Sequence, residues 1–170
     1  MSNQERLELK ELLKYLNLFY DYHEDFTEQE IKEILKIYRG YECKEASDRK
    51  KKIKELWNEC FKCVNPRILN HYGLCFQYIV FSYDEMFWCY LTSINLGYYQ
   101  AAYNLAYFYQ HQNHSGEEKN FIDQKTKLYL SLASKNGHSK AKFELAKFYL
   151  TKGKLDKYRK YCYELIQKGW

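Results

Sequence analysis

A thirteen-residue pattern in the second half of the chain occurs twice, forty positions apart. The first copy runs from Gly97 to Tyr109 and the second from Gly137 to Tyr149. Gly, Ala, Leu, Ala, Phe and Tyr coincide at six fixed offsets. A period of about 20 to 50 residues is typical of stacked repeats, in which each unit buries its apolar residues against its neighbours. The pattern therefore predicts a helical-repeat fold with long exposed faces, whose ordinary function is to hold another molecule.

The composition favours helices throughout. The 170 residues include 19 Tyr and 10 Phe but one Pro and seven Gly, which fits regular structure in a single domain. The N-terminus lacks the pattern of a secretory signal, and the most apolar run, 74–81, is too short to span a membrane. Six cysteines in such a chain fit free thiols in a reducing compartment. We therefore expect an intracellular, cytoplasmic protein.

Apolar spacing and helix-end signals predict about nine helices. Thr27 with Glu30, and Ser82 with Glu85, predict capping boxes, and Asn65 before a proline predicts a helix start. The polar segment 111–119 is expected to be a loop. The predicted helices span about 4–21, 27–40, 48–63, 65–80, 82–97, 98–110 and 121–136, with one more ending before Gly153 and a last one over 155–168.

The repeat extends in both directions from its clearest copies. Gly169 aligns with Gly137, and Trp57 aligns with Tyr90. We therefore expect residues 1–170 to form one helical-repeat domain. Its predicted parts are an N-terminal helical cap over 1–46, a degenerate repeat over 47–81, repeats over 82–112 and 119–151, and a C-terminal half-repeat over 154–170.

The pattern that carries the repeat is an aromatic position, a small residue, Gly, Ala, Leu-Ala and Tyr. It resembles that of the Sel-one-like repeats, relatives of the tetratricopeptide repeats. Its two clearest copies here are Cys89-Tyr90…Ser93…Gly97…Ala101…Leu105-Ala106…Tyr109 and Tyr129-Leu130…Ala133…Gly137…Ala141…Leu145-Ala146…Tyr149.

The resemblance implies an all-α fold, a right-handed α-solenoid of antiparallel helix pairs that serves as a protein scaffold or adaptor. It also implies a concave surface lined by the first helix of each pair, near 84–96, 121–136 and 155–168. On that surface Lys127, Lys135 and Arg159 would favour an acidic or carboxylate-bearing partner.

Tyrosines are too numerous for one buried face. Tyr99, Tyr103 and Tyr107 recur at four-residue spacing and are expected to be exposed. Tyrosine is favoured at binding hot spots, which makes the three candidates for partner binding. A tyrosine-rich surface without a binding role explains the pattern equally well.

One cluster of residues has the spacing of a metal site. Cys60 and Cys63 near one helix end could join His71 and Cys75 on the next helix as four zinc ligands. The repeat alignment favours core thiols and a surface histidine instead, because Cys60 and Cys75 fall on core positions. The predicted 111–119 loop contains four further candidate metal ligands, His111, His114, Glu117 and Glu118, which could bind a metal ion weakly. Exposed polar residues without a metal are the commoner explanation for such a group in a loop.

The sequence contains no phosphate-binding glycine loop, zinc-protease helix motif or serine-nucleophile elbow. A catalytic pair formed by Cys89 and a histidine distant in sequence remains an open alternative, although cysteines are often buried in helical cores. We expect no enzyme activity and no cofactor.

The basic charge lies in the last third of the chain, where residues 119–170 contain 13 Lys and Arg against four Asp and Glu. A nucleic-acid-binding protein is therefore the main alternative to the scaffold. The excess of lysine over arginine also fits a solvated face. A self-associating structural or assembly subunit is the further alternative.

Overall fold

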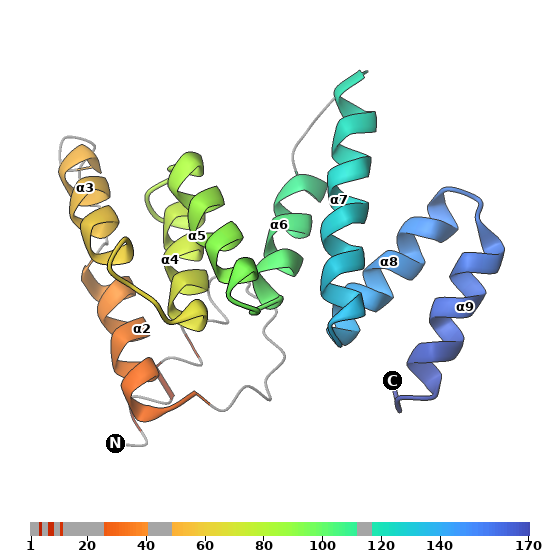
Figure 1. Ribbon diagram of the computed structural model, residues 1–170, viewed down its shortest axis with the longest axis horizontal. Coiled ribbons are helices and arrows are strands. Elements are labelled where there is room, and N and C mark those ends of the chain that lie inside the picture. The colour runs from red at the N-terminus through yellow and green to blue at the C-terminus, as the bar shows by residue number, and fades with distance from the viewer. Residues whose placement is uncertain (1–3, 5–6, 9–10, 12–25, 41–48, 112–116) are drawn as a thin grey trace. The chain divides into compact units, whose positions relative to one another are not determined.

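The computed structural model describes residues 4, 7, 8, 11, 26–40, 49–111 and 117–170. Within these ranges the chain forms eight helices and no strand, which confirms the all-α prediction (Figure 1). The predicted 4–21 helix lies mostly outside the described residues. The helices are α2 (Glu28–Gly40), α3 (Arg49–Cys60), α4 (Pro66–Tyr78), α5 (Tyr83–Asn95), α6 (Gln100–Gln110), α7 (Glu117–Lys135), α8 (Ser139–Thr151) and α9 (Leu155–Ile166).

The chain divides into two compact units. Unit 1 covers Met1–Cys89 and unit 2 covers Tyr90–Trp170, so the boundary falls within α5. In unit 1, α4 packs against both α2 and α3. Its core includes Ile34, Leu56, Leu69 and Phe76, none of which is exposed to solvent.

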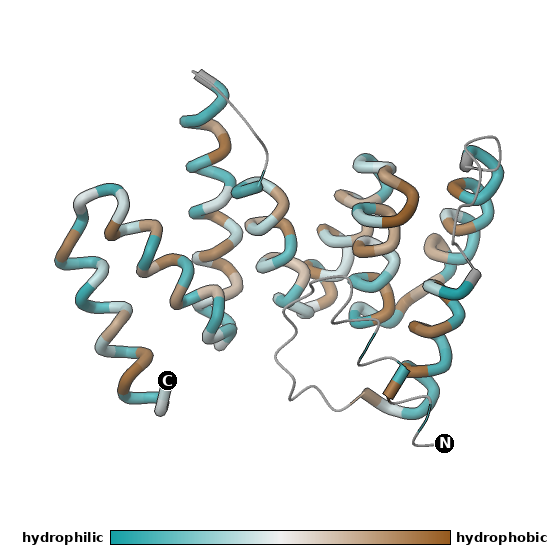
Figure 2. The backbone as a smooth tube through the Cα atoms, turned by 180° about the vertical axis from the view of Figure 1, so that it is seen from behind, coloured by the Kyte–Doolittle hydropathy of each residue, from teal (hydrophilic) through white to brown (hydrophobic). Residues whose placement is uncertain are grey.

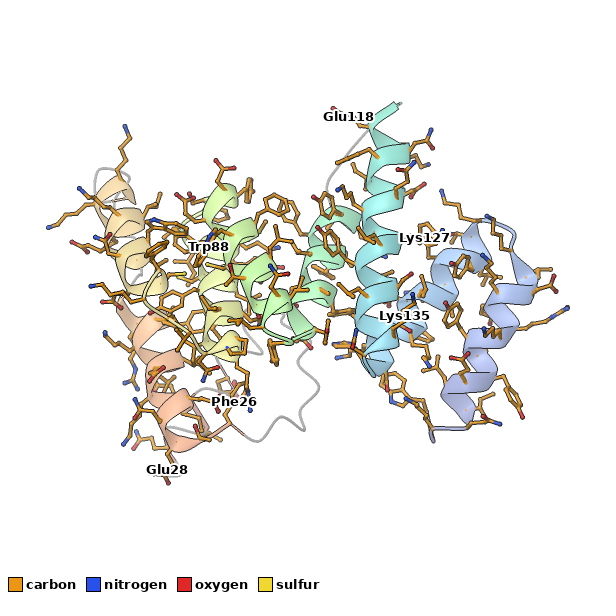
Figure 3. The ribbon with its side chains drawn as sticks, viewed as in Figure 1. Phe26, Glu28, Trp88, Glu118, Lys127 and Lys135 are labelled. Carbon is orange, nitrogen blue, oxygen red and sulfur yellow. The ribbon has the colours of Figure 1, made fainter. Side chains whose placement is uncertain are left out.

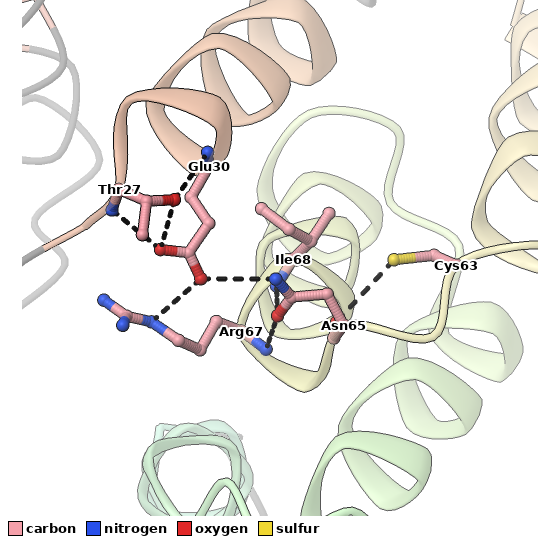
Figure 4. Close-up of polar contacts among 6 residues, drawn as sticks. All are labelled: Thr27, Glu30, Cys63, Asn65, Arg67 and Ile68. Atoms are coloured by element: carbon pink, nitrogen blue, oxygen red, sulfur yellow. Dashed lines mark hydrogen bonds and ion pairs between the residues drawn. The ribbon is translucent and has the colours of Figure 1, made fainter.

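The starts of α2 and α4 in unit 1 are joined by one polar cluster (Figure 4). Thr27 and Glu30 form the predicted capping box, because the Glu30 amide donates to the Thr27 hydroxyl and the Thr27 amide donates to the Glu30 carboxylate. Asn65 caps α4, as predicted, by accepting from the amides of Arg67 and Ile68. Asn65 also donates to Glu30 at 3.2 Å. Burial raises the pKa of Glu30, but these bonds and the Arg67 charge outweigh it, so the pKa is lowered.

In unit 2 each helix from α6 to α9 contacts the next along the chain. The two copies of the thirteen-residue pattern supply equivalent core residues: Ala101 and Ala141, and likewise Leu105 and Leu145, are fully buried. Hydrophobic and hydrophilic residues alternate along these helices (Figure 2). None of the helices in the described ranges is both long and apolar enough to cross a lipid bilayer.

Stacked tyrosine pairs occur at equivalent positions in unit 2. Tyr109 of α6 stacks on Tyr129 of α7, with ring centroids 5.9 Å apart and planes 9° apart. Tyr149 of α8 stacks on Tyr161 of α9 at 5.7 Å and 7°. Burial raises the pKa of Tyr129, so its ring stays neutral at physiological pH.

The glycines that begin the two pattern copies end the preceding helices. Gly97 and Gly137 have φ of 91° and 92°, a left-handed conformation that glycine adopts without a Cβ penalty. The next amide donates back to the helix in both cases, from Tyr98 to the Ser93 carbonyl at 3.0 Å and from His138 to the Ala133 carbonyl at 3.1 Å.

The start of α7 differs from the prediction. The helix begins at Glu117, four residues before the expected start at 121, so the predicted 111–119 loop is too long. Acidic residues are favoured in the first turn of a helix, where backbone N–H groups lack partners. Glu118 lies in that turn, and the polar composition that predicts a loop over 111–119 is equally typical of a first helical turn.

Candidate functional site

The predicted partner-binding cations lie on exposed helix surfaces in unit 2. Lys127 and Lys135 are exposed on α7 (Figure 3), and Arg159 is exposed on α9. Arg159 has one weak ion-pair contact, 4.0 Å from Asp156, which is itself exposed. These side chains are therefore accessible to a partner.

Large apolar side chains accompany these cations. Phe121 and Leu128 are each 54% exposed and lie seven residues apart, on one face of α7 that also contains Lys135. We call these three residues the α7 face. On α9, Leu155, Arg159, Tyr163 and Ile166 share one exposed face by helical spacing, with Tyr163 at 63% and Ile166 at 68% exposure. We call these four the α9 face.

The three candidate tyrosines differ in exposure. Tyr103 is only 8% exposed, so its predicted exposure is wrong. Its ring stacks on His138 with centroids 4.6 Å apart, and it belongs to the core of unit 2. Tyr99 and Tyr107 are half-buried, and Tyr107 stacks on His111 at 3.8 Å.

His71 is completely buried, so the predicted surface histidine is wrong. Its Nδ1 lies 3.2 Å from the Tyr38 hydroxyl, and its ring packs edge-on against Phe26. Burial, followed by the nearby charge of Arg67, lowers the pKa of His71 to about 3. The imidazole is therefore neutral at physiological pH.

The structure does not bring the four predicted zinc ligands together. Cys60 lies against Cys89, with the two sulfurs 3.1 Å apart, while the Cys63 sulfur is 3.6 Å from the Asn65 carbonyl oxygen. Cys60 and Cys75 are fully buried, as core thiols should be. Across the part of the chain that is described, no three His, Cys, Asp or Glu side chains converge as metal ligands. In the other candidate metal set, His114 lies outside the described residues, as does the side chain of Glu117.

Cys89, left open as a catalytic thiol, has the environment of an inert core cysteine. Burial raises the pKa of Cys89 well above its ordinary value, and its contact with Cys60 raises it further. A protonated thiol is a weak nucleophile, since the thiolate is the reactive species.

A cavity of about 460 Å³ lies between α7, α8 and the end of α6. Helix α7 lines it with Lys119, Ile122, Asp123 and Thr126, and α8 lines it with residues at the same spacing, among them Glu144, Lys147 and Phe148. We call it the α7–α8 cavity. Sequence reasoning missed it, although a polar residue at a mid-helix core position, Thr126, was a usable signal.

Comparisons of the chain with protein-family models, curated proteins and solved structures found no match. The Sel-one-like resemblance therefore stays a prediction, and the functional argument depends on the geometry of unit 2.

Proposed function

We propose that the chain is a non-catalytic interaction scaffold, a right-handed solenoid of Sel-one-like helix pairs whose α7 and α9 faces bind another protein. The equivalent core residues, the paired tyrosine stacks and the glycine helix ends support the repeat architecture. These features recur at the spacing of the sequence repeat, as stacked units require.

The observation that carries the binding proposal is the mixture of exposed apolar and basic side chains on α7 and α9. Phe121 and Leu128 share the α7 face with Lys135, and Tyr163 and Ile166 share the α9 face with Arg159. Clustered apolar side chains bordered by charge are typical of protein-binding surfaces. The charge favours a partner with acidic groups around an apolar contact.

The test begins with recovery of the tagged protein from its native cell, with and without nuclease treatment. A stoichiometric protein that survives nuclease is then produced and titrated calorimetrically with the variant Lys135→Glu/Arg159→Glu. We expect affinity to fall at least about tenfold, because two attractive charges become repulsive. The matched control Lys50→Glu/Lys51→Glu makes the same change of net charge on exposed positions of α3 and should bind normally. Equal affinity of both variants would reject the α7 and α9 faces as the binding surface.

Nucleic-acid binding is the second candidate, favoured by the charge of residues 119–170. The four acidic side chains there, Asp123, Glu144, Asp156 and Glu164, each lie within 4.0 Å of a lysine or arginine, and the 13 cations outnumber them. This function predicts affinity that falls steeply with salt. Loss of all co-purifying protein on nuclease treatment would favour it over the scaffold.

A further inference from the structure

Helix α9 is the structural equivalent of α7 within unit 2. Both helices are followed by a left-handed glycine, Gly137 at φ 92° and Gly169 at φ 79°. In each case the amide after the glycine donates to a carbonyl five residues earlier, at 3.1 Å for α7 and 3.2 Å for α9. Each helix also stacks one tyrosine, Tyr129 or Tyr161, on the helix before it. A residue of α7 therefore corresponds to the residue 32 positions later in α9.

One row of α7 side chains lies towards α8. Asp123 and Thr126 line the α7–α8 cavity, and Leu130 packs in one cluster with Ala141 of α8. Ser134 continues the row at helical spacing. Thr126, Leu130 and Ser134 are 2%, 0% and 6% exposed, so this row is covered where α8 packs along α7. We call these four residues of α7 the α7 row.

The corresponding row of α9 is apolar and open to solvent. It consists of Leu155, Tyr158, Cys162 and Ile166, which we call the α9 row. Leu155 is 49% exposed and Ile166 is 68% exposed, whereas Tyr158 and Cys162 are half-buried. Contiguous apolar side chains on a surface are typical of interaction sites. The α9 row therefore offers to a further helix the surface on which α8 packs in α7.

The charges around the α9 row select the kind of helix that fits it. Helix α8 is basic, and its Lys152 pairs with Asp123 of the α7 row. Leu155 replaces that aspartate in the α9 row, so a second helix like α8 would lose this ion pair. Arg159 lies one turn after Leu155, its side chain is 75% exposed, and its contact with Asp156 is a weak one at 4.0 Å. An exposed guanidinium beside apolar side chains favours a helix with carboxylates along its apolar face.

We infer that the α9 row binds an amphipathic helix of the partner protein, which packs on α9 as α8 packs on α7 and places a carboxylate near Arg159. Recognition of this kind uses apolar anchors at helical spacing, which the α9 row matches. The buried Ala141 at the α7–α8 contact shows that a small residue there lets two helices approach closely. This inference rests on the proposed scaffold function and specifies the element that the partner supplies.

The experiment titrates the full ¹⁵N-labelled chain with a capped peptide that copies residues 138–152 of α8 with its four lysines replaced by glutamate. We expect saturable amide shifts at Cys162 and Ile166. The peptide of native sequence should bind at least about tenfold more weakly, because its lysines repel Arg159. A scrambled peptide of the acidic composition is the matched control and should give no saturable shifts at these residues. Equal binding of the acidic and scrambled peptides, or shifts confined to Leu130 of the α7 row, would overturn the inference.

Substitutions on the surface separate apolar docking from attraction of charge alone. Ile166→Asp should weaken binding of the acidic peptide at least about tenfold, because it places a charge within the apolar contact. The matched control Leu96→Asp makes the same change at a residue of unit 2 that is 51% exposed, and it should keep the affinity. Arg159→Glu should weaken the acidic peptide and strengthen the native one. Equal losses for the two Asp variants, or an unchanged preference in Arg159→Glu, would refute the helix site.

Titration of the purified partner protein distinguishes this inference from the proposed function. Affinity that falls with Lys135→Glu/Arg159→Glu but not with Ile166→Asp would reject the helix site and leave the scaffold intact. Self-association of the chain that Ile166→Asp abolishes in sedimentation would assign the α9 row to a second copy and reject a partner helix. If no protein partner is recovered, the scaffold is rejected, whereas the peptide titration still decides the helix site.

Discussion

The buried histidine of unit 1 predicts a loss of stability in mild acid. His71 has a folded-state pKa of about 3, well below the ordinary value of 6.5. Between these two values the unfolded chain binds a proton that the folded chain does not, so the stability conferred by the neutral imidazole is complete above 6.5 and falls as the pH drops towards 3. The slope approaches about 1.4 kcal/mol per pH unit, which gives a loss of about 2 kcal/mol between pH 7 and pH 5.

The assay is urea unfolding followed by tryptophan fluorescence at a series of pH values. Trp57 and Trp88 lie in unit 1, so replacing the exposed Trp170 of unit 2 by Phe makes the signal specific for unit 1. The test variant is His71→Phe, which keeps a ring in the core but cannot titrate. Its free energy of unfolding should lack the extra decline between pH 6.5 and pH 5 that the parent shows.

The variant also removes a hydrogen-bond partner of the Tyr38 hydroxyl, which costs about 1–3 kcal/mol at every pH. Tyr38→Phe/His71→Phe removes both polar groups and should recover most of that loss, again without the pH dependence. His111→Gln is the matched control, because it deletes an exposed histidine of unit 2. Parallel pH profiles for the parent and His71→Phe would refute the buried, neutral imidazole.

Two further predictions concern unit 2. Leu105→Ala and Leu145→Ala should each lower its free energy of unfolding by about 2–5 kcal/mol in urea titrations followed by circular dichroism, because both leucines are fully buried; a loss below about 1 kcal/mol at either position would contradict its burial. The 2.7 Å bond from Lys142 to Glu164, and then the charges around it, lower the pKa of the Glu164 carboxyl, so its stabilisation is present above the ordinary value of 4.5 and disappears as the pH falls through the lowered pKa. A double-mutant cycle with Lys142→Met and Glu164→Gln should give a coupling of about 1 kcal/mol at pH 7 that vanishes near pH 2, and a coupling independent of pH would contradict the ion pair.

Local signals in the sequence predicted much of the fold. Thr27 and Asn65 cap the helices that they were expected to cap, and Gly97 and Gly137 end theirs. These features depend on residues within one turn of each other, so the sequence contains all the information needed. The predicted start of α7 is too late, because charged residues are common both in the first turn of a helix and in polar loops.

Contacts between distant residues account for the wrong predictions. His71 is buried by Tyr38, 33 residues away, in a part of the chain outside the clear repeats. Tyr103 is covered by His138, which stacks on it from the start of the next pattern copy. A four-residue spacing describes where a side chain lies on its own helix, but it does not show which other element covers that side chain. The exposure of Lys127 was easier to predict, because a lysine is rarely buried without a partner.

Buried polar residues in this chain separate into two kinds, which affect the stability of the fold in opposite directions. His71 is a polar side chain within an apolar core, yet its ring nitrogen has the Tyr38 hydroxyl as a hydrogen-bond partner. Its burial is therefore explained within unit 1. Thr126 is polar where the equivalent position of the preceding repeat has the apolar Met86. Its hydroxyl has no hydrogen-bond partner among the described residues, although Thr126 lines the α7–α8 cavity. A satisfied polar group stabilises a particular packing, whereas an unsatisfied one costs stability until something binds it. Replacing a polar residue by an apolar one should therefore raise stability where one unit breaks the repeat pattern without an internal partner, and Thr126 is such a position.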